Sequence, residues 1–186
     1  MFEIFIFLGV FILILILMYN SLINKKNEVE NIFASVDTTL KKRFDLIPNL
    51  VQSVSKYMEH EKSLLEKITE LRSSAMKPGI GEKEKIAIDK KMSSILGSIM
   101  IAVENYPDLK ANENVMHLQR TLHEVEAQIA AARRAYNQAV TNYNNAIEMI
   151  PTNIMASMMK YERKDVFEIA ENERGSVSVK ELFEES

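Results

Sequence analysis

The first nineteen residues of the chain form an almost unbroken apolar stretch. They read MFEIFIFLGVFILILILMY, and Glu3 is the only charged side chain among them. A helix of this length spans about 28 Å, close to the thickness of the hydrocarbon core of a bilayer. A signal peptide would begin with basic residues and end at small ones, whereas Glu3 stands near the start and Met18, Tyr19 and Asn20 stand at the end. The pattern predicts an uncleaved transmembrane helix over residues 1–19.

Apolar residues then recur at alternating spacings of three and four between Val115 and Ile150. One series is Val115, Leu122, Ile129, Tyr136, Tyr143 and Ile150, and the interleaved series is Leu118, Val125, Ala132, Ala139 and Ala146. Both series fall on one face of an α-helix. Asn112 is a suitable N-cap and Pro151 marks the end, so a helix is predicted over residues 112–150.

Shorter stripes of the same period occupy residues 29–44, 47–75 and 88–106, and Glu61 is the one polar residue in the second. Pro48 should interrupt a helix, while Asp45 is a suitable N-cap, so we expect two helices to meet at a corner around residues 43–49. The predicted helices are 20–44, 46–76, 83–106 and 112–150, which favours an antiparallel up-and-down four-helix bundle. The all-α chain then divides into an anchor at 1–19, a bundle at 20–153 and a Met-rich, then acidic, tail at 154–186.

The predicted helices differ in length. The last would be about 58 Å long against about 37 Å for the first, so residues 136–149 should protrude, bend or pack on something else. If they extend beyond their own bundle, their apolar stripe must be buried in another subunit. A homo-oligomer is then expected.

The composition excludes several kinds of partner and site. A net charge of −3 argues against a nucleic-acid partner, and the absence of cysteine excludes disulfides and thiolate metal sites. No basic residue precedes the apolar stretch, whereas Lys25 and Lys26 follow it. Because positive charge stays in the cytoplasm, we expect an inner or plasma membrane protein with its N-terminus outside and its bulk in the cytoplasm.

The sequence offers no pattern typical of catalysis or metal binding. The histidines His60, His117 and His123 lack the Glu-x-x-His spacing of di-iron bundles, and no nucleophile elbow or phosphate loop is present. Glu61 could have a raised pKa in its apolar stripe, but an ion pair with Lys56 or Lys62, or exposure to solvent, is the preferred interpretation. We therefore predict no enzyme, no cofactor and no metal.

Two polar regions are candidates for binding. The two predicted corners far from the membrane should bring seven residues to one tip: Arg43, Asp45, Asn49, Tyr106, Asp108, Lys110 and Asn112. They either cap helices and form corners or dock a cytoplasmic protein. Beyond Pro151, the Met-rich residues 154–159 and the basic Lys160, Arg163 and Lys164 could rest on the membrane or pack on the bundle, and both alternatives stay open. In the acidic stretch 171–186, a short docking element could be formed by Val177, Val179, Leu182 and Phe183.

Several stretches resemble the LemA family of bacterial membrane proteins. They are LKKRFDLIPNLVQSV at 40–54, YMEHE at 57–61, ENYPDLKANENVMHLQ at 104–119, AQIAAARRAYNQAVTNYN at 127–144 and IPTN at 150–153. Phe33 stands where the family tends to have tryptophan, and Ile150 where it tends to have phenylalanine. The resemblance implies a single N-terminal span, a four-helix bundle, a cytoplasmic domain and, for some members, an association with a membrane protease.

The preferred function is therefore a membrane-anchored interaction or scaffold protein that works through the surface of its bundle. The alternative is a transmembrane signal transducer or sensor whose helices shift, although residues 1–3 are too few to bind a ligand outside the cell.

Overall fold

The computed structural model describes residues 2–167, which are all-helical and contain no strand. Residue 1 and residues 168–186, with the apolar positions proposed as a docking element, lie outside the described part. The long helices are α1 (Phe2–Val54), α2 (Lys62–Ala75), α3 (Glu82–Val103) and α5 (Glu113–Glu148). The short ones are the 3₁₀ turn η1 (Glu59–Glu61), α4 (Pro107–Lys110) and α6 (Thr152–Met158). The prediction of an all-α chain is confirmed.

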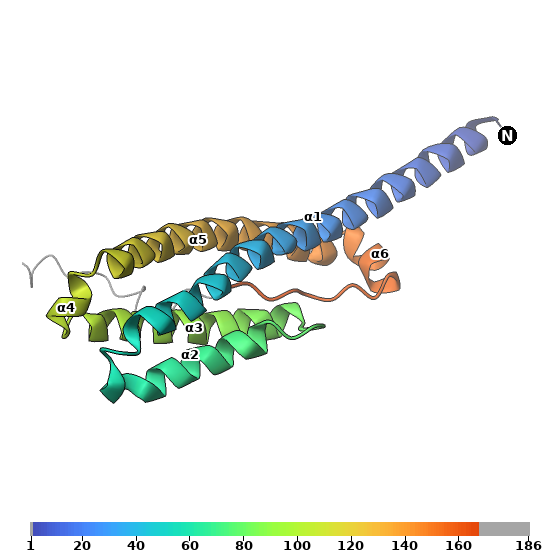
Figure 1. The fold of residues 1–186 in the computed structure, drawn as a ribbon. Coiled ribbons are helices and arrows are strands. Elements are labelled where there is room, and N and C mark those ends of the chain that lie inside the picture. The colour runs from blue at the N-terminus through green and yellow to red at the C-terminus, as the bar shows by residue number, and fades with distance from the viewer. Residues whose placement is uncertain (1, 168–186) are drawn as a thin grey trace, which may run out of the picture.

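The long helices lie alongside one another, and consecutive ones run in opposite directions (Figure 1). The most extensive packing joins α1 to α5 and α2 to α3. The connection from α1 to α2 and the corner around α4 lie at the end farthest from the N-terminus, whereas α6 lies beside α1 at the other end (Figure 1). We call residues 20–167 the helical body and its far end the distal tip.

The N-terminal third of α1 projects from this body (Figure 1). This helix is long and apolar enough to cross a membrane, and none of its most apolar window is buried within the chain. The first fully buried residue is Leu22, only three positions after Tyr19. The apolar stretch and the first buried position of the body therefore lie on one unbroken helix.

The corner expected at Pro48 is wrong, because α1 continues through this residue to Val54. A proline cannot donate the helical hydrogen bond to the carbonyl four residues earlier, which here belongs to Phe44. That carbonyl instead accepts a hydrogen bond of 2.9 Å from Nε of Arg72 in α2. Pro48 itself is exposed, and the helix breaks only after Val54.

The longer α1 removes the expected mismatch in helix length. Residues 20–54 extend over about 52 Å and α5 over about 54 Å, so the two match along the body. Tyr136 and Tyr143 are 1% and 3% exposed, and the Tyr136 ring lies 5.5 Å from that of Phe33 in α1. The end of α5 is thus covered by its own chain, and the condition on which the expectation of a homo-oligomer rested is not met.

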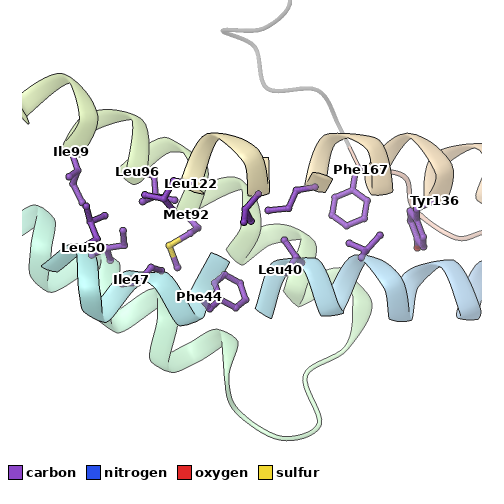
Figure 2. Close-up of a cluster of buried hydrophobic side chains, with 14 of the residues drawn as sticks. Leu40, Phe44, Ile47, Leu50, Met92, Leu96, Ile99, Leu122, Tyr136 and Phe167 are labelled. Carbon is purple, nitrogen blue, oxygen red and sulfur yellow. The ribbon is translucent and has the colours of Figure 1, made fainter. Parts of the chain in front are cut away.

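The apolar stripes meet in one continuous core. Figure 2 shows side chains of α1, α3 and α5 converging, among them Leu40, Phe44, Ile47, Met92, Leu96, Ile99 and Leu122. The predicted cap of α5 is confirmed, since the Asn112 side chain accepts hydrogen bonds from the amides of Asn114 (3.0 Å) and Val115 (3.4 Å). Gly79, with φ of 80°, forms the turn between α2 and α3, where a side chain would be strained.

Candidate functional site

The distal tip contains four of the seven residues that the sequence placed there. Tyr106, Asp108, Lys110 and Asn112 lie in and around α4. Asp108 and Lys110 are exposed, and Lys110 forms an ion pair with Glu104. The two charged side chains of α4 are therefore available to a partner without supporting the core.

The other three residues lie in α1, because that helix does not turn at Pro48. Asp45 caps no helix and forms a surface ion pair of 2.6 Å with Lys41. Asn49 is exposed on the last turns of α1. Arg43 lies eleven residues before Val54, about 16 Å along the axis, and its side chain is completely buried. The expected seven-residue cluster is wrong for Arg43, which belongs to a different site.

That site is a charged cluster in the middle of the body, formed by Arg43, Asp89, Glu126 and Arg133. Asp89 of α3 is 1% exposed and forms ion pairs with Arg43 of α1 and Arg133 of α5. Nη1 of Arg43 also donates hydrogen bonds to Oε1 of Glu126 (2.7 Å) and to the Ser93 hydroxyl (2.9 Å). Two cations and two carboxylates balance, so each buried charge has a partner. The cluster ties three helices together.

The sequence contains a signal for this cluster, although it matches no known motif. Arg43 lies on the apolar stripe of α1, where Leu40 and Ile47 flank it at spacings of three and four. Asp89 lies three residues before Met92 on the buried face of α3. A basic and an acidic residue at core positions of two helices predict a buried ion pair, since neither would be tolerated there alone.

A groove opens over the charged cluster between α3 and α5, with a volume of about 1000 Å³. It is lined by Asp89 and Arg133 of the charged cluster and by the apolar side chains of Leu96, Leu122 and Phe167. The Arg133 guanidinium lies 5.7 Å from the centre of the Phe167 ring. A largely apolar groove that also presents charged side chains has a lining typical of ligand-binding sites.

Two asparagines hold the chain after α6 against α5. The Asn137 side chain donates to the Phe167 carbonyl and accepts from the Phe167 amide, both at 2.8 Å. Asn144, one heptad later, makes the same pair of bonds to Lys164, both at 3.0 Å. The Tyr143 hydroxyl donates to the Glu162 carbonyl (3.1 Å), and burial raises the pKa of that tyrosine. In both Tyr-Asn pairs, Tyr136-Asn137 and Tyr143-Asn144, the tyrosine packs in the core and the asparagine pairs with main-chain groups of the segment after α6.

The remaining candidates for chemistry are scattered. His60, His117 and His123 are all exposed. Glu61 is half-buried at the end of η1, and Lys62 pairs with Glu66 at 3.7 Å instead. Among residues 2–167 no group of three or more histidine or acidic side chains is arranged to hold a metal ion.

The helical body is continuous with a helix that is able to cross a membrane. This architecture is that of a membrane-associated, all-helical protein. The LemA family profile matches residues 32–180, and the chain belongs to the LemA family. It is 27% identical to Protein LemA of Metamycoplasma hominis over 94% of this chain and 80% of that relative. It is also 22% identical to Magnetosome protein MamQ 2 of Paramagnetospirillum magneticum, over 94% of this chain and 74% of the relative. Magnetosome protein MamQ of Magnetospirillum gryphiswaldense is likewise 22% identical, over 84% and 67% of the two chains.

Proposed function

We propose that the protein is a membrane-anchored, non-enzymatic interaction or scaffold protein. Residues 2–19 cross the inner or plasma membrane, and the helical body works in the cytoplasm as an antiparallel up-and-down four-helix bundle. The observation that carries this proposal is the continuity of α1 from its exposed apolar stretch to the fully buried Leu22.

This continuity determines how the body is held. No flexible linker separates the apolar stretch from the core, so the body keeps a fixed distance and direction relative to the bilayer. The first part of α1 within the body is held by its packing against α5 and α6. This rigid attachment suits a protein that presents binding surfaces at a defined distance from the membrane.

The orientation follows from the charges that flank the apolar stretch. Lys25 and Lys26 are the first charged residues after it, whereas Glu3 is the only charge within residues 2–19. Positive residues next to a span are retained in the cytoplasm, which places the body there.

The distal tip is the surface that we propose for docking a cytoplasmic or membrane protein. It lies farthest from the bilayer and exposes both signs of charge at Asp108 and Lys110, with Ile101 nearby in sequence 72% exposed. A membrane protease, the partner class implied by the resemblance to the family, is the first candidate. Because the Tyr136–Tyr143 stripe is covered within the chain, this proposal does not need a homo-oligomer.

The docking surface can be tested by photo-crosslinking in intact cells followed by mass spectrometry. A photoreactive residue replaces Asp108 at the tip, His123 at the groove or Lys67 on α2, all three of which are exposed. We expect a discrete protein adduct at position 108 and none at position 67. Adducts at 123 alone would move the docking surface to the groove, and adducts at none of the three positions would contradict an interaction protein.

A paired variant separates docking from folding. Asp108→Ala with Lys110→Ala removes only exposed side chains, so the melting temperature should stay nearly unchanged while the adducting partner is no longer retained in a pull-down. A parallel fall in melting temperature and partner binding would instead assign these residues to the structure of the corner.

A further inference from the structure

The short helix α6 carries an unusually exposed apolar stripe. Ile154 and Met158 are 64% and 80% exposed, and their spacing of four residues places them on one side of the helix. Ile150, in the turn before Pro151, is 83% exposed. The opposite side faces the core through Met155, Ala156 and Met159. No residue from Met149 to Met159 is charged, so the exposed stripe lies within an entirely uncharged segment.

The position of this stripe along α1 points to the membrane. α6 lies beside α1 where the apolar stretch enters the body (Figure 1), and the two helices pack against each other. Leu22 is three residues beyond Tyr19, about 4.5 Å along the helix axis. The headgroup layer of a bilayer is about 5–7 Å thick on each side, so α6 lies at its depth.

The charges around α6 agree with a lipid surface. Lys160 lies just after the C-cap Met159 and is exposed. Lys25 and Lys26 lie on α1 within four residues of Leu22, and Lys26 forms an ion pair of 3.3 Å with Glu30. Glu148, the nearest acidic residue before α6, is neutralised by an ion pair with Arg163. An apolar stripe with cations at its edge is the arrangement by which interfacial helices bind anionic membranes.

We propose that α6 and the turn before it form a second membrane contact, in which Ile154 and Met158 of the helix and Ile150 of the turn insert into the headgroup region of the bilayer that α1 crosses. This inference rests on the proposed anchoring of α1. With α1, it gives the body two attachments, which fix its tilt and its rotation about the helix axis. The segment after Pro151 was expected either to rest on the membrane or to pack on the bundle. In this proposal it does both, because one side of α6 packs on the body and the other contacts lipid.

The experiment is a depth measurement on the full chain in vesicles of phosphatidylcholine and phosphatidylglycerol. The chain lacks cysteine, so single substitutions can carry a nitroxide label. Ile154→Cys is the test position, and Leu13→Cys in the apolar stretch is the reference. The matched control is Ile101→Cys, an isoleucine 72% exposed at the end of α3 near the distal tip. Collision with oxygen, which concentrates in lipid, is compared with collision with a water-soluble nickel complex.

We expect the ratio of oxygen to nickel collisions to be several-fold higher at 154 than at 101, and highest at 13. Equal ratios at 154 and 101, with 13 in lipid, would overturn the contact of α6 while leaving the anchor intact. A label at 13 that collides mainly with nickel would overturn the anchor and this inference together. If the label at 154 were shielded from both reagents, protein would cover the stripe. The same would follow if its spectrum were broadened by a second label and sharpened when unlabelled protein was added. Either result would also overturn the inference.

Discussion

Nε of Arg72 donates a hydrogen bond of 2.9 Å to the main-chain carbonyl of Phe44, the acceptor that Pro48 leaves without its helical donor. A side chain of α2 therefore replaces the hydrogen bond that the proline removes from α1. We call this replacement the repair of α1. Because α1 survives Pro48, it runs the full length of the body and covers the end of α5.

Arg72→Met should therefore destabilise the protein by about 1–3 kcal/mol, since it removes a charged donor and leaves a carbonyl unsatisfied. In a Pro48→Ala background, where residue 48 can donate to Phe44 itself, the same change should cost less than half as much. Chemical unfolding of the full chain in detergent, followed by circular dichroism, measures both costs. Arg120→Met, at an exposed site on α5, is the control and should be nearly neutral. Equal costs of Arg72→Met in the two backgrounds would refute the repair.

The buried ion pair of Arg43 and Asp89 predicts a large effect from a nearly isosteric change. Asp89→Asn leaves Arg43 buried without its carboxylate partner in α3 and should destabilise by about 3–5 kcal/mol. Asp45→Asn, which breaks only the surface pair with Lys41, should cost about 0–1 kcal/mol. Adding Arg43→Met to Asp89→Asn should recover part of the loss, because it removes the buried guanidinium that has lost one of its two carboxylate partners. Similar costs for the two aspartate variants in the same unfolding assay would contradict the role of the cluster.

The amide pair between Asn137 and Phe167 predicts a local effect on hydrogen exchange. Asn137→Ala removes two hydrogen bonds of 2.8 Å, each contributing about 1 kcal/mol, so exchange in the segment 161–167 should accelerate roughly tenfold or more. Exchange mass spectrometry on that peptide is the measurement. Asn142→Ala, which removes a surface bond to Gln138, should leave the peptide unchanged. Unaltered exchange in the Asn137 variant would show that packing alone holds the segment.

Tyr136 predicts a loss of stability at alkaline pH. Burial, and then the charge of Glu82 and a hydrogen bond to it, raise the pKa of its hydroxyl above the ordinary value of 10.0. The folded protein thus holds the proton more tightly than the unfolded chain does. Its stabilising contribution is complete below about pH 10 and is lost as pH rises from there toward the folded pKa. Tyr136→Phe should flatten the fall in unfolding free energy between about pH 10 and 11 relative to its value at pH 8, and an unchanged slope would contradict this.

The sequence predicted those features that depend on periodicity and local chemistry. The apolar stretch, the stripes of α3 and α5 and the Asn112 cap all follow from residues close together in the chain. The sequence did not predict features that depend on a residue far away in the chain. Pro48 predicts a break unless Arg72, 24 positions later, is known to reach the Phe44 carbonyl.

The candidate site illustrates the same limit. Arg43 was assigned to a surface tip because the corner was misplaced, although its position on an apolar stripe already indicated burial. The groove between α3 and α5 and the amide pairs of Asn137 and Asn144 arise from segments far apart in sequence, which no local pattern encodes.

The central claim is that α1 is lodged in the bilayer and holds the body on the cytoplasmic side. Labelling of Asp108→Cys with a membrane-impermeant maleimide, scored on membranes washed with alkaline carbonate, tests it most directly. We expect the protein to stay in the washed membranes and to be labelled only after the cells are permeabilised. Labelling in intact cells, or release of the protein by the carbonate wash, would contradict it.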